Sequence, residues 1–237
     1  TLLLMSNGTA VSAGLFNKLP FDATKDFAPV SLLGLFDLAV VVPASSKYRT
    51  LTDLVADAKA NPGKLNLGSI AIGSTQNLAA ELFKSTAGID LQIVPFNGTP
   101  AVVTALRGGS IDAAVEIVSP VKGQITGGAL RALAVMGEKR EASMPNVQTV
   151  AEAGGARAGF NVASWNALAA PANTPRERIA YLNREVNAVL AQPEVKAKLA
   201  SFDVEARGST PEALGQLLAS EIRRWSGVIE KAKIPKQ

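Results

Sequence analysis

Short apolar runs alternate with segments that carry helix signals, and this alternation is the strongest constraint on the fold. Residues 65–69 and 91–96 are each short and apolar enough for a buried strand. Each run is followed by a turn rich in Gly, Ser, Thr or Asn, and then by apolar residues at helical spacing. A strand followed by a helix, repeated along the chain, predicts an α/β fold.

Threonines mark the expected starts of several helices. Thr50, Thr99 and Thr210 each stand immediately before a helical pattern, where a side-chain oxygen can accept a hydrogen bond from the first turn. Thr174 and Glu177 have the spacing of a capping box. Proline follows three of these threonines, and proline is well suited to the first helical position.

Two apolar stretches are longer than the other predicted strands and almost free of charge. They cover residues 30–42 and 161–170. A protein of two lobes needs strands that cross from one lobe to the other, and these stretches are the candidates. We therefore expect two lobes of α/β structure rather than a single sheet.

The chain contains no cysteine and no histidine. This composition excludes a Ser-His-Asp triad, a thiolate nucleophile and an ordinary zinc site. The formal net charge is +4, with basic residues dispersed rather than clustered between aromatic residues, so we expect no nucleic-acid partner. No segment has the pattern of a transmembrane helix or a signal peptide.

Three turns that join a strand to a helix are rich in small polar residues. They are residues 6–9, 68–76 and 97–100. Hydroxyls, side-chain amides and helix N-terminal amides can bind an anion, and glycine allows the backbone to approach it. A helix cap alone explains each turn taken singly. Their repetition favours a binding site, because ligands of open α/β sheets bind at the carboxyl ends of strands.

Two carboxylates lie four residues apart on one predicted strand. Asp112 and Glu116 would share a face of that strand, and Glu116 stands in an otherwise apolar run. Glu116 could face the cleft and meet an amine or hydroxyl of a ligand, or it could be a partly exposed charge at a strand end. We find no nucleophile positioned beside either carboxylate.

The two tryptophans could suggest a stacking platform. Trp225 belongs to an amphipathic helical pattern and is expected in the core. Trp165 lies on a predicted crossing strand, where it could touch a cleft, although the core is again the expected place.

The ordered set of motifs resembles the Bug family of tripartite tricarboxylate transporter receptors, which are extracytoplasmic solute-binding proteins. The matching stretches are 19–22 (LPFD), 25–30 (KDFAPV), 62–66 (PGKLN), 73–76 (GSTQ), 78–79, 81–83, 94–96 (VPF), 98, 100–101, 130–135 (LRALAV), 145–147 (PNV), 149–154 (TVAEAG), 170–171 and 174–175. The resemblance spans nearly the whole chain.

The resemblance implies a type II periplasmic-binding-protein-like fold, with two Rossmann-like lobes, two crossing strands and a ligand cleft. Lobe 1 would comprise residues 1–40 and 166–237, and lobe 2 residues 41–165. By family likeness the lobes close around a small carboxylate, which could be a dicarboxylate, an acidic amino acid or an aromatic acid. The site would need no cofactor and no metal, and the protein would not be an enzyme.

The turns and the resemblance together give a set of expected ligand-binding residues, with Glu116 assigned to the far end of the ligand. They are Ser6, Asn7, Gly73, Ser74, Thr75, Gln76, Gly98, Thr99, Pro100 and Glu116. The resemblance also implies a periplasmic monomer whose partner is an integral-membrane permease or a signalling protein.

The sequence departs from the family pattern in a few places. Family members begin with a further strand, loop and helix, so we expect this chain to be N-terminally incomplete. The family commonly has His where Asn77 stands, Tyr where Phe96 stands, and Asp near Glu116.

Two other classes of function remain open from the sequence. A small-molecule-sensing effector domain of a regulator or signalling system shares this lobe architecture, although no helix-turn-helix signature is present. An enzyme that uses carboxylates and a lysine would need a pair with perturbed pKa values in the cleft.

Overall fold

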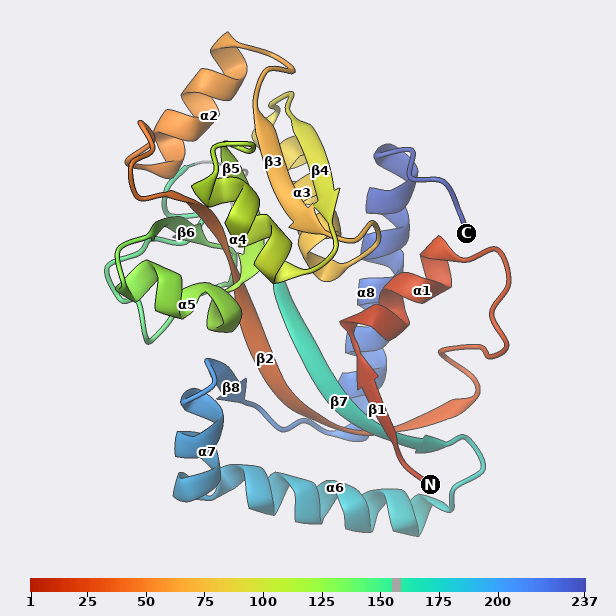
Figure 1. Ribbon diagram of the computed structural model, residues 1–237. Helices are drawn as coiled ribbons and strands as arrows, with labels where there is room; N and C mark the ends of the chain where they lie inside the picture. Colours follow the sequence, from red (N-terminus) through yellow and green to blue (C-terminus); the bar gives the residue numbers. More distant parts are fainter. Residues whose placement is uncertain (155–158) are drawn as a thin grey trace. The chain divides into compact units, whose positions relative to one another are not determined.

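The computed structural model describes residues 1–154 and 159–237 and divides into two compact units (Figure 1). Unit 1 consists of Thr1–Phe36 and Ser164–Gln237, and unit 2 of Asp37–Ala163. The chain passes between the units inside one long strand, β2 (Phe27–Pro43), and at the start of another, β7 (Ala163–Pro171). The α/β class and the two crossing strands are confirmed.

Unit 2 is a mixed sheet whose strands follow the order β4-β3-β5-β2-β6. Strand β3 pairs in parallel with both β4 and β5, whereas β2 pairs antiparallel with β5 and β6. The elements of unit 2 that follow β2 are α2 (Leu51–Ala60), β3 (Asn66–Ile70), α3 (Thr75–Ala87), β4 (Gln92–Phe96), α4 (Thr99–Arg107), β5 (Ala113–Ile117), α5 (Val118–Thr126) and β6 (Leu130–Val135).

The chain reverses its direction across this sheet after β4. It runs from β3 through α3 to the neighbouring β4, and then from β4 through α4 past β3 to β5. Crossovers between parallel strands are right-handed, so a reversal of direction places successive helices on opposite faces of the sheet. Figure 1 shows α4 in front of the strands and α3 behind them. The turns after β3 and β4 therefore lead to opposite faces of the sheet.

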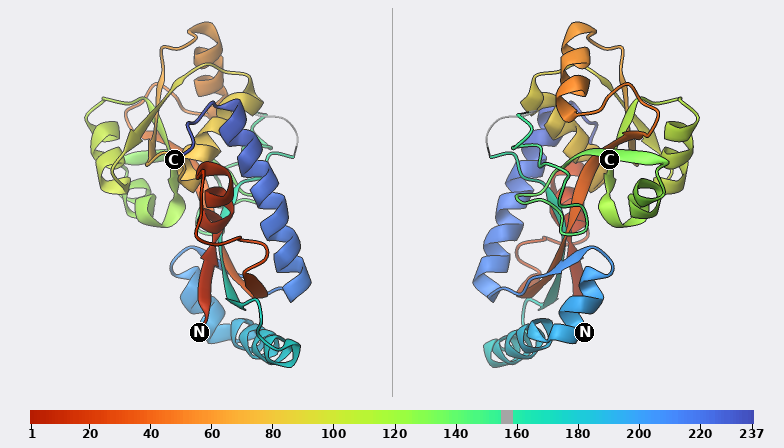
Figure 2. Two further views of the ribbon diagram at one scale, coloured as in Figure 1. Left: turned by 90° about the vertical axis from the view of Figure 1, so that its right-hand side faces the viewer. Right: turned by 90° about the vertical axis from the view of Figure 1, so that its left-hand side faces the viewer.

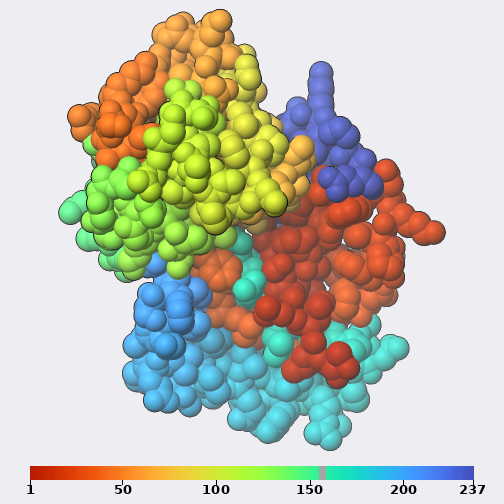
Figure 3. Space-filling view, in the orientation of Figure 1, coloured from red at the N-terminus to blue at the C-terminus, as the bar shows by residue number. Residues whose placement is uncertain are grey.

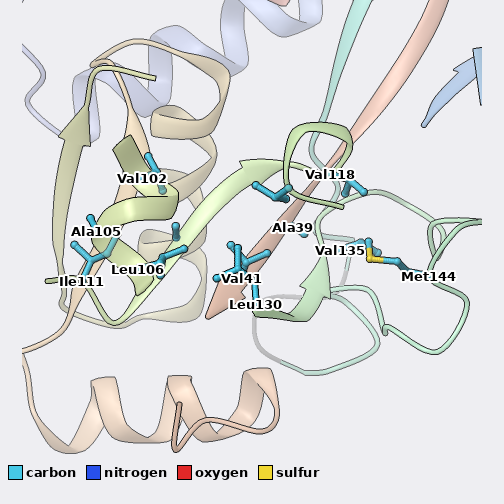
Figure 4. Close-up of a cluster of buried hydrophobic side chains, with 12 residues drawn as sticks. Ala39, Val41, Val102, Ala105, Leu106, Ile111, Val118, Leu130, Val135 and Met144 are labelled. Atoms are coloured by element: carbon cyan, nitrogen blue, oxygen red, sulfur yellow. The ribbon is translucent and has the colours of Figure 1, made fainter. Parts of the chain in front are cut away.

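One apolar cluster fastens α4 and α5 to the sheet of unit 2 (Figure 4). Leu106 of α4 and Val121 of α5 are fully buried, as are Val41 of β2 and Ala114 of β5. Strand β5 is buried on both faces, which explains why all of its residues except Glu116 are apolar, with no alternation of polar and apolar positions. This packing fixes the strand that carries Glu116.

Unit 1 places β1 (Leu3–Ser6) at the edge of the strand order β1-β7-β2, and β8 (Val204–Ala206) pairs with β2. Helix α1 (Asn7–Leu15) packs along α8 (Pro211–Lys231), as the left view of Figure 2 shows. A Cβ at Gly14 would lie 2.7 Å from the Ser226 hydroxyl, so glycine permits this close approach. Trp225 is fully buried on α8, which confirms its expected place in the core.

The helices α6 (Arg176–Ala191) and α7 (Pro193–Ala200) of unit 1 contain no buried residue, although every residue of both is described. Figure 3 shows both helices, in cyan and light blue, on the visible face. Hydrogen bonds also tie α6 to the rest of unit 1. The Asn183 side-chain amide donates to the carbonyl oxygens of Val30 and Ser209 at 2.7 Å each.

Two of the four expected helix starts are confirmed. The Thr50 and Thr210 side chains accept hydrogen bonds from the first turns of α2 and α8. The other two were wrong. Helix α6 is preceded by Pro175 without a side-chain cap, and Gly98 rather than Thr99 is the N-cap of α4. No helix in the described part of the chain is long and apolar enough to cross a membrane.

Asp57, in the last turn of α2, collects three hydrogen-bond donors. Lys47 Nζ lies 2.7 Å from Oδ2, the Tyr48 hydroxyl donates to Oδ2 at 2.6 Å, and Asn61 Nδ2 donates to Oδ1 at 2.6 Å. These contacts, with Lys47 first, lower the pKa of Asp57 to about 2. A carboxyl whose pKa falls on folding stabilises the fold above its unfolded pKa of about 3.9 and loses that contribution as pH falls through the folded value.

We predict that Asp57→Asn lowers the melting temperature at neutral pH and flattens its decline between about pH 4 and pH 2. The substitution removes the charge that Lys47 and Tyr48 contact, and with it the group that titrates in this window. Thermal unfolding across this pH range measures both effects. The control is Glu138→Gln, at an exposed glutamate of the same unit. An unchanged acid slope in Asp57→Asn would show that the cluster contributes nothing.

Candidate functional site

The turns after β3 and β4 lie at the ends of adjacent parallel strands. Ile70 at the end of β3 pairs with Phe96 at the end of β4, so both strands stop at the same level. One turn leads to α3 and the other to α4, on opposite faces of the sheet. Ligands of open α/β sheets bind outside the carboxyl ends of the strands, beside the point where the strand order reverses, and in this sheet that point lies between β3 and β5.

Asn77 fixes the turn after β3. Its Oδ1 accepts a hydrogen bond from the backbone N–H of Gly73 at 3.1 Å, and its Nδ2 donates to the hydroxyl of Ser69 at 3.2 Å. The Ser74 hydroxyl in turn accepts from the Asn77 backbone N–H and caps α3. Gly73 has φ +80°, a left-handed conformation that favours glycine. The turn is therefore held in one shape before any ligand arrives.

Gly98 and Thr99 shape the turn after β4. Gly98 has φ +90°, which again favours glycine, and its position as the N-cap leaves Thr99 as the first residue of α4. The Thr99 hydroxyl is consequently not used as a cap. It donates a hydrogen bond to Oε2 of Glu116 at 2.9 Å. Pro100 follows in the first turn of the helix.

Glu116 links the two turns to β5. It is 0 % exposed, and its Oε2 accepts the hydrogen bond from Thr99. Burial raises the pKa of Glu116, against the opposing effect of hydrogen bonds from the Thr99 hydroxyl, the Gln76 side chain and the Ile117 backbone. The structure thus brings two predicted residues, Gln76 of α3 and Thr99 of α4, to the carboxyl group of a third, Glu116 of β5.

Eight of the ten predicted site residues belong to unit 2 and gather at these strand ends. They are Gly73, Ser74, Thr75, Gln76, Gly98, Thr99, Pro100 and Glu116. Their assignment to a ligand remains a prediction. Their shared position at neighbouring strand ends is what the sequence pattern led us to expect.

Ser6 and Asn7 belong to unit 1, at the junction of β1 and α1. Ser6 is the N-cap of α1 and forms a capping box with Thr9. Asn7 is almost fully buried, and its Oδ1 accepts a hydrogen bond from Trp225 Nε1 at 2.9 Å. That bond ties α1 to α8, so one of the two polar groups of Asn7 serves the packing of unit 1.

Asp112 and Trp165 differ in whether their side-chain polar atoms have a hydrogen-bond partner. Asp112 lies just before β5 and not within it, so it does not share a strand with Glu116 as expected. Its Oδ2 accepts a hydrogen bond from the backbone N–H of Asn66, the first residue of β3, at 2.8 Å. Trp165 is 1 % exposed, in agreement with the expected core position. Its Nε1 is buried and has no hydrogen-bond partner among the described residues.

Asn77 and Ser69 are the residues that the sequence reasoning missed. Asn77 was noted only as a departure from a family pattern, and Ser69 only as part of a polar turn. The available signal was the spacing of Ser74 and Asn77, because the third position after an N-cap faces back toward the turn. A side chain there can bond the backbone that precedes the helix.

The site offers neutral donors, two helix N-termini and one buried acid. Helices α3 and α4 both begin at this edge of the sheet, and their N-terminal ends favour a negative charge. Such an arrangement binds and orients a small anion. No group of three or more possible metal-ligating side chains occurs in the parts of the chain that the structure describes.

We predict that Asn77→Ala lowers the free energy of unfolding by about 1–3 kcal/mol, because the buried Ser69 hydroxyl and the Gly73 N–H each lose a partner. Chemical denaturation measures the loss. The matched control is Asn146→Ala, at an exposed asparagine of the same unit, which should change the stability by less than about 0.5 kcal/mol. Equal effects of the two substitutions would contradict a fixed turn.

A comparison with known families finds one that spans the chain. The family described as "Tripartite tricarboxylate transporter family receptor" matches residues 1–234. Among curated proteins, "UPF0065 protein in tcbD-tcbE intergenic region" of Pseudomonas sp. (strain P51) is 34% identical over 99% of this chain and 69% of its own length. "Protein BugT" of Bordetella pertussis is 33% identical over 98% of this chain and 71% of its own.

Solved structures of similar fold include two that contain carboxylates. "R. palustris Rpa4515 with adipate" superposes with a TM-score of 0.85 at 30% identity, over 99% of this chain and 78% of that one. "MatC (Rpa3494) from Rhodopseudomonas palustris with bound malate" gives 0.76 at 28%, over 97% and 79%. "Structure of periplasmic binding protein BugD" gives 0.81 at 25%, over 100% and 79%.

Proposed function

Because this chain belongs to the Bug family of tripartite tricarboxylate transporter receptors, we propose that it captures a small carboxylate for such a transporter. The observation that carries the proposal is the meeting of two N-terminal helix ends and their polar turns at the carboxyl ends of β3 and β4. Backbone amides and hydroxyls at such ends bind a carboxylate without a basic side chain.

The named ligands of two similar structures support the choice of ligand class. Adipate and malate each carry a carboxylate at both ends, and they differ in length and in the hydroxyl that malate bears. We propose that this protein recognises the carboxylate through the turns at residues 73–76 and 98–99. The length and substitution of the rest of the ligand would be set by the groups beyond those turns.

The protein acts as a receptor rather than an enzyme in this proposal. The sequence contains no histidine or cysteine, and Glu116 is contacted by a hydroxyl, a side-chain amide and a backbone amide rather than by a second acid or base. General acid–base catalysis would need a second titratable group placed to exchange a proton. We further propose a periplasmic location and a permease of the same transport system as the partner, as the family assignment suggests.

A thermal-shift experiment with matched ligands tests this function. Each acid is paired with its neutral amide: succinate with succinamide, adipate with adipamide, and benzoate with benzamide. A ligand present at a hundred times its dissociation constant stabilises the fold by about 2.7 kcal/mol. We expect at least one acid to raise the melting temperature by several degrees while its amide does not.

Sodium chloride at equal ionic strength is the control for nonspecific salt effects. The proposal is contradicted if no carboxylate shifts the melting temperature of a cooperatively unfolding sample, or if each amide acts as well as its acid.

A further inference from the structure

One oxygen of Glu116 has a partner and the other has none. Oε2 accepts the hydrogen bond of Thr99, whereas Oε1 is buried and has no hydrogen-bond partner among the described residues. Buried polar atoms in folded proteins are nearly always hydrogen-bonded, since an unpaired one keeps the whole cost of its dehydration. An oxygen of this kind at a ligand-binding edge is a place for a hydrogen bond from the ligand.

The neighbours of Glu116 identify the group as an acceptor. The Thr99 hydroxyl donates to Oε2, and the Gln76 side chain and the Ile117 backbone N–H are further donor groups near the carboxyl that lower its pKa. Burial raises the pKa of Glu116, and these donors oppose that effect by favouring the ionised form, which has no hydrogen to give. The unpaired Oε1 therefore calls for one more donor rather than for an acceptor.

The position of Glu116 also restricts which part of a ligand can approach it. Gln76 lies in the first turn of α3 and Thr99 in the first turn of α4, so the carboxyl contacts both helix starts. A ligand carboxylate brought next to Glu116 would meet a like charge in a poorly hydrated environment, which is unfavourable. A hydroxyl or an ammonium group on the ligand would instead satisfy Oε1.

We propose that Glu116 determines specificity, with Oε1 accepting a hydrogen bond from a hydroxyl or ammonium group of the bound carboxylate. The inference rests on the proposed function and narrows its ligand class to hydroxy- and amino-substituted carboxylates. Sites built to bond a polar hydrogen reject analogues that lack it, because the buried acceptor is then left unpaired.

A purely structural role for Glu116 would affect folding but not the choice between ligands. The decisive measurement is therefore a ratio of affinities within pairs of ligands that differ by one donor group. Suitable pairs are malate and succinate, aspartate and succinate, and mandelate and phenylacetate, with both enantiomers of each chiral acid. The first and third pairs test a hydroxyl, and the second tests an ammonium group.

Titration calorimetry on the full chain gives the ratio for each pair in the native protein and in variants. We expect the native protein to bind the substituted member of at least one pair about tenfold more tightly or better. Glu116→Gln, which keeps the shape but weakens the acceptor, should reduce that preference several-fold. Glu116→Leu, which removes the acceptor, should abolish it. Glu138→Gln, at the exposed glutamate, should leave it unchanged.

Thermal unfolding of each variant establishes whether it is folded. If Glu116→Leu does not fold, the test uses Glu116→Gln alone. The inference is overturned if the native protein binds both members of every pair equally, or if the preference is undiminished in a folded Glu116 variant. Either result leaves carboxylate capture intact. Failure of the native protein to bind any of these acids would overturn the proposed function as well.

Discussion

The parallel pairing of β3 with β4 and β5 is the constraint on which the candidate site depends. Residues Gly68, Val94 and Ala114 lie side by side across these three strands, so their carboxyl ends face the same edge. The reversal of direction after β4 then sends one helix to each face. Two helix N-termini consequently lie at the same edge of the sheet.

Hydrogen bonds within unit 2 convert this topology into a site of fixed geometry. Asn77 holds the first turn through Gly73 and Ser69, and Thr99 connects the second turn to Glu116. Because these bonds form within the protein, the ordering of the turns is completed on folding rather than on binding. A site prepared in this way loses less conformational entropy when a ligand arrives.

The electrostatics of the edge combine two opposing elements. Helix N-termini favour negative charge, while the buried carboxyl of Glu116 disfavours a second negative charge at its own position. An anion with its charge at one end and a polar hydrogen at the other satisfies both.

Much of this arrangement could be predicted from the sequence, and the failures have identifiable physical causes. Alternating apolar runs and polar turns predicted the α/β class and the edge where the turns gather, since both follow from local periodicity. Thr99 was wrongly expected to cap α4, because the sequence does not show that Glu116, seventeen residues later, competes for its hydroxyl. Thr174 failed as a cap for a different reason, since the helix begins one residue later than the spacing suggested.

Long-range partners explain the remaining gaps in the site. The hydrogen bond between Asn7 and Trp225 joins residues 218 positions apart, so no local sequence pattern predicts it. The unpaired Oε1 of Glu116 likewise follows from three-dimensional packing, although the lone acid in an apolar run marked the residue as unusual. Local sequence signals therefore located the edge of the sheet where the site lies. The hydrogen-bond partners of its individual residues could be seen only in the structure.

Chemical-shift mapping tests the central claim most directly, because it reports where a carboxylate binds and not only whether it binds. A ¹⁵N-labelled sample would be titrated with the acid that gives the largest thermal shift. The account predicts the largest and saturable amide shifts at residues 73–77 and 98–99, with smaller changes at residues 116–117. Saturable shifts that leave both turns unaffected, or no saturable shifts at all, would contradict a carboxylate site at the ends of β3 and β4.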